Sequence, residues 1–398
     1  MRFTTTMMEV GRWALPDFLP WDPAVHEDSP VSDLIGDGWA WLPWKLRLPD
    51  GTGVKVVYDF LRDEGESPYE VRAEGGRFVL DADGEPLCAV TFDQRPGWIV
   101  RRTRDGATMG KVMSWLSPVC LQAFPIRYCA YASRGDVCAF CCLNPMDRDL
   151  AGATRDGLLM RPAHAAEVYD AAVGEGGVRH VCLTGGGLYN QRAEAEHFAR
   201  VIEAIATVRD ARGRRDPLKA MTTAMGAEEQ RRLKIAGADE ISFNMEVWAE
   251  RLWPVVVPGK AKVVGRARWM ERLAAAVEVF GRGRVLSQFV LGVETVAPEG
   301  FRDPEAALAS VTEGFEWCAR HGVVPRTHVW MNTPGSAYER STAPPTEYLL
   351  AAALARHRAV AAAGLYRDIE AYPQGSASCP ECSYVDTDAD FHRLLGAA

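Results

Sequence analysis

The sequence predicts an α/β fold, a partial (βα)6 TIM-like barrel preceded by a mainly-β amino-terminal domain. Three observations predict it. From about residue 111 onward, six apolar strand-like runs alternate with six runs that have helical spacing. The connections between these runs are short, so the strands are expected to pair in parallel with right-handed crossovers. Six units are fewer than the eight of a closed barrel, so the barrel is expected to stay open.

The first 110 residues show no alternation of strands and helices. Short strand-like runs occur instead, and Asp-Gly pairs such as Asp50–Gly51 and Asp83–Gly84 mark turns between them. We therefore expect an antiparallel accessory domain over residues 1–110. Its expected strands are Trp41–Leu48, Gly53–Phe60, Tyr69–Glu74, Arg77–Leu80, Cys88–Phe92 and Trp98–Arg101.

The barrel is expected over residues 111–365, and residues 366–398 follow it as a carboxyl-terminal tail. Several of its helical runs end at a glycine, as helices commonly do. The expected strands are Val119–Ile126, Val178–Leu183, Leu218–Met225, Glu240–Val247, Val285–Leu291 and Val324–Asn332. The expected helices are Ala163–Val173, Ala193–Val208, Glu228–Ala236, Arg266–Phe280, Pro304–His321 and Glu347–Ala363.

Composition limits the classes of function. The formal net charge is -8 with no block of like charges, which argues against binding to a nucleic-acid backbone and favours a small-molecule substrate. No apolar run reaches the roughly 20 residues of a membrane span. The first residues lack the apolar stretch of a signal peptide, so we expect a cytoplasmic location. In that reducing compartment the ten cysteines are expected to be thiols or metal ligands.

Four of the ten cysteines lie between Cys129 and Cys142. Eight residues separate Cys129 from Cys138, and two separate Cys138 from Cys141. Three thiolates leave one ligand position of an iron–sulfur cluster open to a small molecule. The loop resembles the cluster loop of the radical S-adenosylmethionine (SAM) superfamily, in which an aromatic residue, here Phe140, precedes the last cysteine. The eight-residue gap departs from the family's usual three.

This resemblance implies a cofactor pair, a [4Fe–4S] cluster held by Cys129, Cys138 and Cys141 together with SAM. In the family, the open iron chelates the amino and carboxylate groups of SAM, and reductive cleavage gives a 5′-deoxyadenosyl radical that abstracts hydrogen from the substrate. A reductase such as flavodoxin or ferredoxin would supply the electron. Family cores are also partial barrels of six units with the cysteine loop after the first strand, which is the order expected here.

The resemblance also implies SAM-binding positions at the carboxyl ends of the strands, where such folds bind ligands. A glycine run after Thr184 resembles the family's GGE segment, with Gly187 in place of the acid, and the alternative is a tight strand–helix turn. Asn244 and Glu246 would bond the ribose, unless they lie on an exposed strand face. The positions in the run are Thr184, Gly185, Gly186 and Gly187.

The fifth strand of the barrel resembles the family motif that flanks the adenine. Val290 and Gly292 would take that place together with Phe140. A buried SAM carboxylate needs a cation, and Arg266 and Lys260 are the candidates.

Two residues near the loop and strand ends are candidates for catalysis. Tyr189 follows the glycine run and is a candidate to face the substrate, and the alternative is a structural role. Cys142 adjoins Cys141, and it is an alternative ligand, a hydrogen-atom donor or an inert packed thiol.

Cys379 and Cys382 form a separate CxxC pair near the carboxyl terminus. The pair is a candidate for a second metal or cluster if other residues complete it, and otherwise a redox pair or an unligated tail.

Two other functions remain open. One is a transferase that uses the same cluster to move the aminocarboxypropyl group of SAM. The other is a structural or electron-transfer protein that binds zinc or iron–sulfur and never binds SAM.

Overall fold

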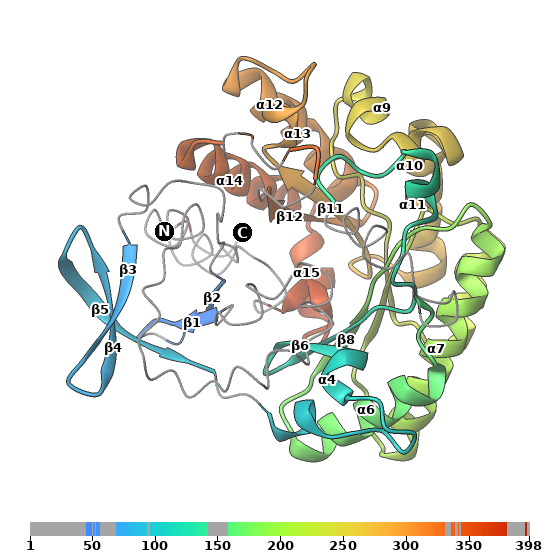
Figure 1. Cartoon of the computed structure of the whole chain (residues 1–398). Helices are drawn as coiled ribbons and strands as arrows, with labels where there is room; N and C mark the ends of the chain where they lie inside the picture. Colours follow the sequence, from blue (N-terminus) through green and yellow to red (C-terminus); the bar gives the residue numbers. More distant parts are fainter. Residues whose placement is uncertain are drawn as a thin grey trace.

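A computed structural model shows two β-sheets, one in each of the two expected regions of the chain (Figure 1). It describes residues 45–49, 51, 53–55, 69–93, 96–141, 158–330, 336–338, 341, 344–379 and 395. The candidate residues Cys142 and Cys382 lie outside these ranges. The two sheets differ in type, because the first is antiparallel and the second is mostly parallel.

The larger sheet has seven strands in the order β12-β11-β10-β9-β8-β7-β6. Strands β7 to β12 run parallel to one another, which confirms the open α/β fold with six parallel strands. An antiparallel strand, β6, extends the sheet at one edge and was not expected from the sequence. The strands are β6 Met113–Ser117, β7 Cys120–Ala123, β8 His180–Leu183, β9 Leu218–Met221, β10 Glu240–Ser242, β11 Val285–Leu291 and β12 Val323–Val329.

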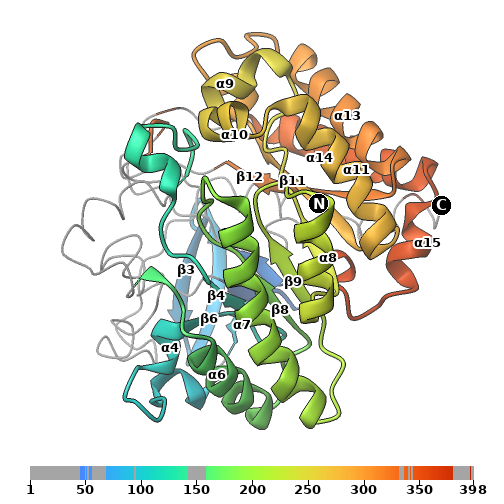
Figure 2. The same ribbon diagram turned by 90° about the vertical axis from the view of Figure 1, so that its right-hand side faces the viewer.

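Six long helices follow the strands and cover the outer side of the curved sheet; Figure 2 shows three of them, α6, α7 and α8, side by side. They are α6 Pro162–Glu175, α7 Gln191–Ala211, α8 Ala227–Ala236, α11 Arg266–Phe280, α13 Pro304–Arg320 and α14 Thr346–Ala362. Each coincides with an expected helix to within a few residues at either end. Within the described ranges, no helix has the length and apolar content needed to cross a membrane.

Shorter helical segments join these elements. They are η1 Gly97–Val100, α4 Met109–Val112, η2 Ala130–Arg134, η4 Glu250–Leu252, α9 Trp253–Val256, α10 Pro258–Val263, α12 Val293–Val296, α15 Leu365–Glu370 and η5 Ser376–Ser378.

Side chains and glycines at the helix ends explain why the helices begin and stop where they do. The side chain of Asn190 accepts a hydrogen bond from Ala193 N at the start of α7, and the side chain of Asp303 accepts one from Glu305 N at the start of α13. Gly237 ends α8 in the left-handed region with φ 109°, where a side chain would be strained.

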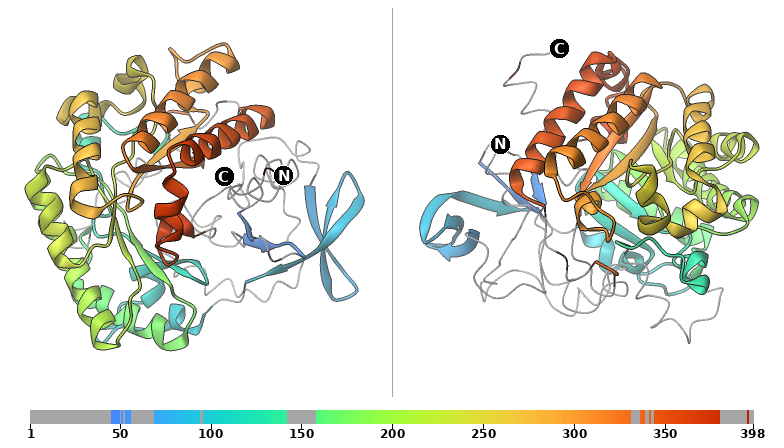
Figure 3. Two further views of the ribbon diagram at one scale, coloured as in Figure 1. Left: turned by 180° about the vertical axis from the view of Figure 1, so that it is seen from behind. Right: turned by 90° about the horizontal axis from the view of Figure 1, so that it is seen from above.

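The amino-terminal sheet has five strands in the order β2-β1-β5-β4-β3 (Figure 3). Its small core contains Leu46, Val71, Leu80 and Val90. The strands are β1 Lys45–Arg47, β2 Gly53–Lys55, β3 Tyr69–Glu74, β4 Arg77–Ala82 and β5 Glu85–Phe92. The mainly-β character expected for this region is confirmed.

One expected strand of this region is wrong. Trp98–Arg101 was expected as a strand, but Gly97–Val100 forms the 3₁₀ helix η1. The apolar residues Trp98 and Ile99 are buried in the core of the barrel and not in the small sheet. Local apolar character therefore indicated burial correctly but not the backbone conformation.

The segment after α15 packs against the polar face of the large sheet. Both carboxylate oxygens of Glu240, the first residue of β10, accept the backbone N–H of Ser376 at 2.9 and 3.0 Å. In β12, Arg326 donates to the carbonyl of Ala377 at 3.1 Å. Cys379 follows this segment and is buried. The first cysteine of the CxxC pair is thus fixed next to the sheet.

A second buried carboxyl joins the end of β11 to α14. The side chain of Glu294 in α12 accepts a hydrogen bond from the hydroxyl of Tyr348. Burial raises the pKa of Glu294 to about 7. Glu294 therefore binds its proton more tightly in the folded chain than in the unfolded one.

This difference predicts a pH dependence of stability. Because the folded pKa is raised, the free energy of unfolding should fall as pH rises from about 4.5 to about 7, by at most about 3 kcal/mol for this group. Glu294→Gln removes the titration, so its stability relative to the wild type should increase over the same window. Urea unfolding between pH 5 and pH 7.5 measures this. Glu299→Gln, an exposed change in the same segment, is the control, and equal slopes for the wild type and Glu294→Gln would contradict the prediction.

Candidate functional site

The cysteine loop follows β7 at the carboxyl edge of the parallel strands. Cys129 precedes the 3₁₀ helix η2, which ends at Gly135 with φ 69°. Cys138 and Cys141 then share a tight turn, in which the N–H of Cys141 donates to the carbonyl of Cys138 at 3.0 Å. The extra residues of the first gap therefore form a defined helical turn.

The thiols of the loop share electrostatic interactions with one lysine, Lys260. Burial raises the pKa of Cys138 to about 12, and the nearby Cys129 raises it further while Lys260 opposes the shift. Burial also raises the pKa of Cys129, again with Lys260 acting in the opposite direction. Burial lowers the pKa of Lys260, but Glu246 and, to a smaller extent, Cys138 and Cys141 raise it, and the net shift is upward. One ammonium group therefore interacts with all three thiols.

Three thiols are a suitable donor set for iron–sulfur chemistry. In the described part of the chain, no three His, Cys, Asp or Glu side chains converge in a way that could hold a single metal ion. A cluster binds each thiolate through a different iron, so it does not require such convergence.

The glycine run that follows β8 and Thr184 packs directly on the backbone of the cysteine loop. The N–H of Gly186 donates to the carbonyl of Ile126, and the carbonyl of Gly187 accepts the N–H of Ala130. A Cβ added to Gly186 would lie 1.8 Å from the carbonyl oxygen of Tyr128. The glycines are therefore needed for a backbone-to-backbone contact. The sequence predicted either a ligand contact or a tight turn here and did not predict this role.

The α9–α10 segment covers the loop from another side. The N–H of Ala139 donates to the carbonyl of Val256 at 2.9 Å, and the N–H of Gly259 donates to the carbonyl of Asp136 at 2.9 Å. Lys262 in α10 also pairs with the Asp136 carboxylate. The loop is thus held between the β8–α7 connection and the segment that follows β10.

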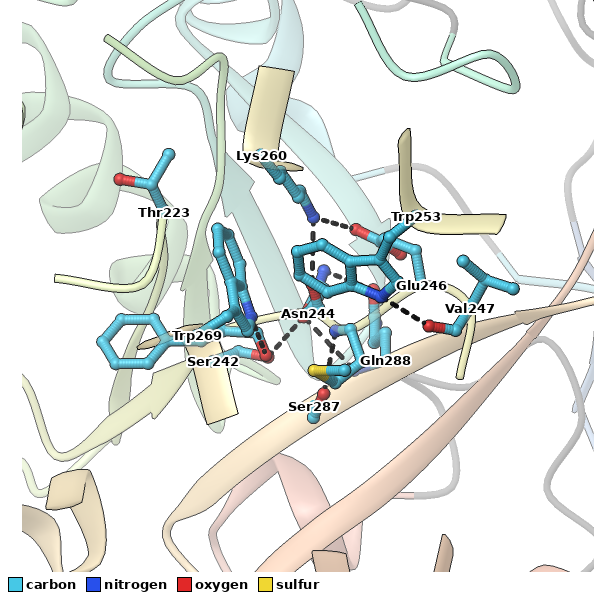
Figure 4. A network of polar contacts seen from close by, with 12 residues as sticks. Thr223, Ser242, Asn244, Glu246, Val247, Trp253, Lys260, Trp269, Ser287 and Gln288 are labelled. Atoms are coloured by element: carbon cyan, nitrogen blue, oxygen red, sulfur yellow. Dashed lines mark hydrogen bonds and ion pairs between the residues drawn. The ribbon is translucent and has the colours of Figure 1, made fainter. Parts of the chain in front are cut away.

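Lys260 of α10 points at the end of β10 (Figure 4). Its ammonium pairs with the Glu246 carboxylate at 2.7 Å and donates to the carbonyl of Asn244 at 3.0 Å. It also lies 4.9 Å from the ring centre of Trp269, close enough for a cation–π contact. The side chains of Lys260 and Glu246 are only 13% and 10% exposed, so this is a largely desolvated ion pair.

Asn244 and Glu246, the residues expected to bond a ribose, both belong to this network. The side-chain oxygen of Asn244 accepts from the hydroxyl of Ser242 and from the N–H of Gln288, and its amide donates to the Gln288 side chain. Glu246 has φ 65°, and its backbone continues the pairing with β11 through Gln288 and Val290. A non-glycine residue in this region is strained, which is common at functional sites.

The other expected SAM-binding residues lie around the same edge. Gly292 has φ 104°, and a Cβ there would lie 2.6 Å from Pro344. Val290 is buried just before it, and Phe140 packs on the barrel core. Arg266 is differently placed, because its guanidinium stacks on Trp248 and donates twice to the carbonyl of that residue.

Tyr189, a candidate for catalysis, lies beside the cysteine loop. The Tyr131 and Tyr189 rings are 5.3 Å apart, and the guanidinium of Arg134 lies 4.3 Å above the Tyr189 ring. The Tyr189 hydroxyl is buried without a hydrogen-bond partner among the described residues. The tyrosine is thus next to the cysteine loop, and its proposed role in catalysis stays a prediction.

One residue of the site was missed by the sequence analysis. Glu194, in the first turn of α7, is buried, and its carboxylate accepts the N–H groups of Leu188 and Thr223 at 2.8 and 2.9 Å. Burial raises the pKa of Glu194 to about 7. The carboxylate joins the glycine-run loop to the end of β9. The sequence signal for this residue was its position as an acid in the first turn of α7, after the capping residue Asn190.

Comparisons with known proteins give limited matches. No family model matches the chain. Over 126 residues the chain is 27% identical to bacteriochlorophyllide c C-7(1)-hydroxylase of Chlorobaculum limnaeum, and this match covers 31% of the chain and 28% of that protein. Among solved structures, methylornithine synthase matches with a TM-score of 0.40 and 14% identity, over 65% of this chain and 71% of the other. The resemblance of the chain to the radical SAM superfamily agrees with the hydroxylase match.

The backbone contact of Gly186 gives a prediction. Gly186→Ala places a Cβ against the backbone of Tyr128 and Cys129, which cannot move away as a flexible side chain could. We expect a loss of about 1–3 kcal/mol or more in stability and a loop that no longer loads iron. Thermal unfolding and iron content after reconstitution measure both effects.

The matched control is Gly174→Ala. A Cβ at that helical position meets only the end of the Arg212 side chain, at 3.9 Å. Alanine is the better helix former, so this variant should be as stable as the wild type or slightly more stable. Iron loading by Gly186→Ala at the wild-type level would refute the proposed contact role.

Proposed function

We propose that the chain is a radical SAM enzyme whose cysteine loop carries a [4Fe–4S] cluster. The observation that supports this most is that Cys129, Cys138 and Cys141 lie on one ordered loop at the carboxyl edge of an open parallel barrel, with Lys260 acting electrostatically on each of them. When bound there by the three cysteines, the cluster would supply the electron for reductive cleavage of SAM, and the 5′-deoxyadenosyl radical would be the species that takes hydrogen from the substrate. The protein supplies position and the exclusion of water.

Different residues of the chain would bind different parts of SAM. The backbone of the run from Thr184 to Gly187 lies against the cysteine loop and would contact the amino group. Val290, Gly292 and Phe140 would border the adenine. The ribose would lie against Asn244 and Glu246.

Lys260 is the better placed of the two cations proposed for the SAM carboxylate. Two of its three N–H donors bond Glu246 and Asn244, so a ligand carboxylate could accept from the third while the buried Glu246 stays paired. Arg266 uses two of its donors on the carbonyl of Trp248. The geometry therefore favours Lys260.

The substrate is proposed to be a small molecule, with a reductase such as flavodoxin or ferredoxin as the electron donor. The relative named as a hydroxylase acts, by its name, at a carbon centre, and this fits abstraction of hydrogen from a C–H bond. Because the match spans 28% of that protein, its substrate is not carried over. The Cys379–Cys382 pair remains a proposed second site.

The test is anaerobic reconstitution of the full chain followed by addition of dithionite and SAM. We expect about four irons per chain and formation of 5′-deoxyadenosine and methionine, both lost in Cys138→Ala. Cys318→Ala is the matched control, since Cys318 is fully buried in α13, away from the loop. It should keep its iron.

Other outcomes separate the alternatives. Methylthioadenosine in place of 5′-deoxyadenosine would indicate aminocarboxypropyl transfer. Bound zinc without cleavage of SAM would refute the enzyme proposal and favour a structural role. An iron count of about eight would indicate a second cluster at the CxxC pair.

A further inference from the structure

Tyr131 lies in the gap between Cys129 and Cys138 and is 2% exposed. A Cβ at Gly187 would lie 3.4 Å from its Cζ, and a Cβ at Gly259 would lie 2.3 Å from its Cδ2. The ring therefore fills the space between the glycine-run loop and α10. Side chains at those two glycines would collide with it or crowd it.

The hydroxyl of Tyr131 has no hydrogen-bond partner among the described residues, although it is buried. A buried polar atom without a partner is costly, and such atoms often mark a place that a ligand completes. The hydroxyl oxygen can accept a hydrogen bond from a bound group that has an N–H donor.

We propose that the Tyr131 hydroxyl is a SAM-binding group whose oxygen accepts a hydrogen bond from the amino group of SAM. The inference rests on the proposed function and deepens it by naming a residue that contacts this part of the cofactor. It involves a hydrogen bond alone, with no covalent or redox step.

The surroundings of Gly187 support this assignment. The resemblance places an acid at this position, but a Cβ there would meet the methyl group of Thr223 at 2.7 Å and the Tyr131 ring at 3.4 Å. The space beyond Gly187 is thus taken by a side chain from the cysteine loop. Tyr131, which lies within the long cysteine gap, thus stands next to the position where the acid of the family pattern is missing.

The experiment compares SAM binding by reconstituted wild type and Tyr131→Phe, using equilibrium dialysis, iron analysis and thermal unfolding. The change keeps the ring and removes the hydroxyl. We expect unchanged iron content and SAM affinity weaker by about tenfold, which is equivalent to about 1.4 kcal/mol. A SAM analogue that lacks the amino group should bind both proteins equally.

Tyr169→Phe is the control, because it removes a buried tyrosine hydroxyl that bonds Asp216 outside the site. It should lower the unfolding temperature and leave SAM affinity unchanged.

Each remaining outcome decides between the two proposals. Equal SAM affinity of Tyr131→Phe and wild type, with iron intact, overturns the inference and leaves the proposed function standing. Loss of iron in Tyr131→Phe also overturns it, because the hydroxyl would then serve to fold the loop. A wild-type chain that loads no cluster or binds no SAM overturns both proposals.

Discussion

The site depends on one close contact, the packing of the glycine run on the backbone of the cysteine loop. Gly186 meets Tyr128 and Cys129 without any side chain between the two segments. Rigid β8 therefore determines where the loop lies, through hydrogen bonds at Gly186 and Gly187. Loops carry function when a scaffold fixes them, and here the scaffold acts through main-chain atoms. The α10 segment, which follows a different strand, closes the other side through Gly259.

Charge in this region is arranged around Lys260. Its ammonium is largely buried beside the Glu246 carboxylate and acts electrostatically on the thiols of the loop. Leaving either member of such a pair alone would be costly, so the pair ties α10 to the end of β10. The strained backbone of Glu246 keeps its carboxylate at that place. The same few residues therefore determine both the position of α10 against β10 and the charge around Lys260.

Much of the barrel could be predicted from the sequence, because its strands are short apolar runs between helices with regular periodicity. Val285–Leu291 and Arg266–Phe280 have the expected ends. Strand β6 was not expected, and η1 was wrongly expected as a strand. Both errors arise because strand pairing and burial at these places depend on segments that are distant in the sequence. Local spacing predicts that the cysteine loop is a cluster site, and that role stays a prediction. The contacts of Tyr131 and Glu194 could not be predicted in this way, since their partners are distant in sequence and meet only in the folded chain.

The contact of Glu240 with Ser376 has a consequence for biosynthesis. The two residues are separated by 136 positions, yet the buried carboxylate at the start of β10 takes its backbone donor from that late segment. During translation the parallel strands emerge in the order in which they pair, so most of the sheet can assemble progressively. Glu240 lacks that donor until more than a hundred further residues have been synthesised. Completion of the barrel interior is in this way linked to synthesis of the segment around Ser376.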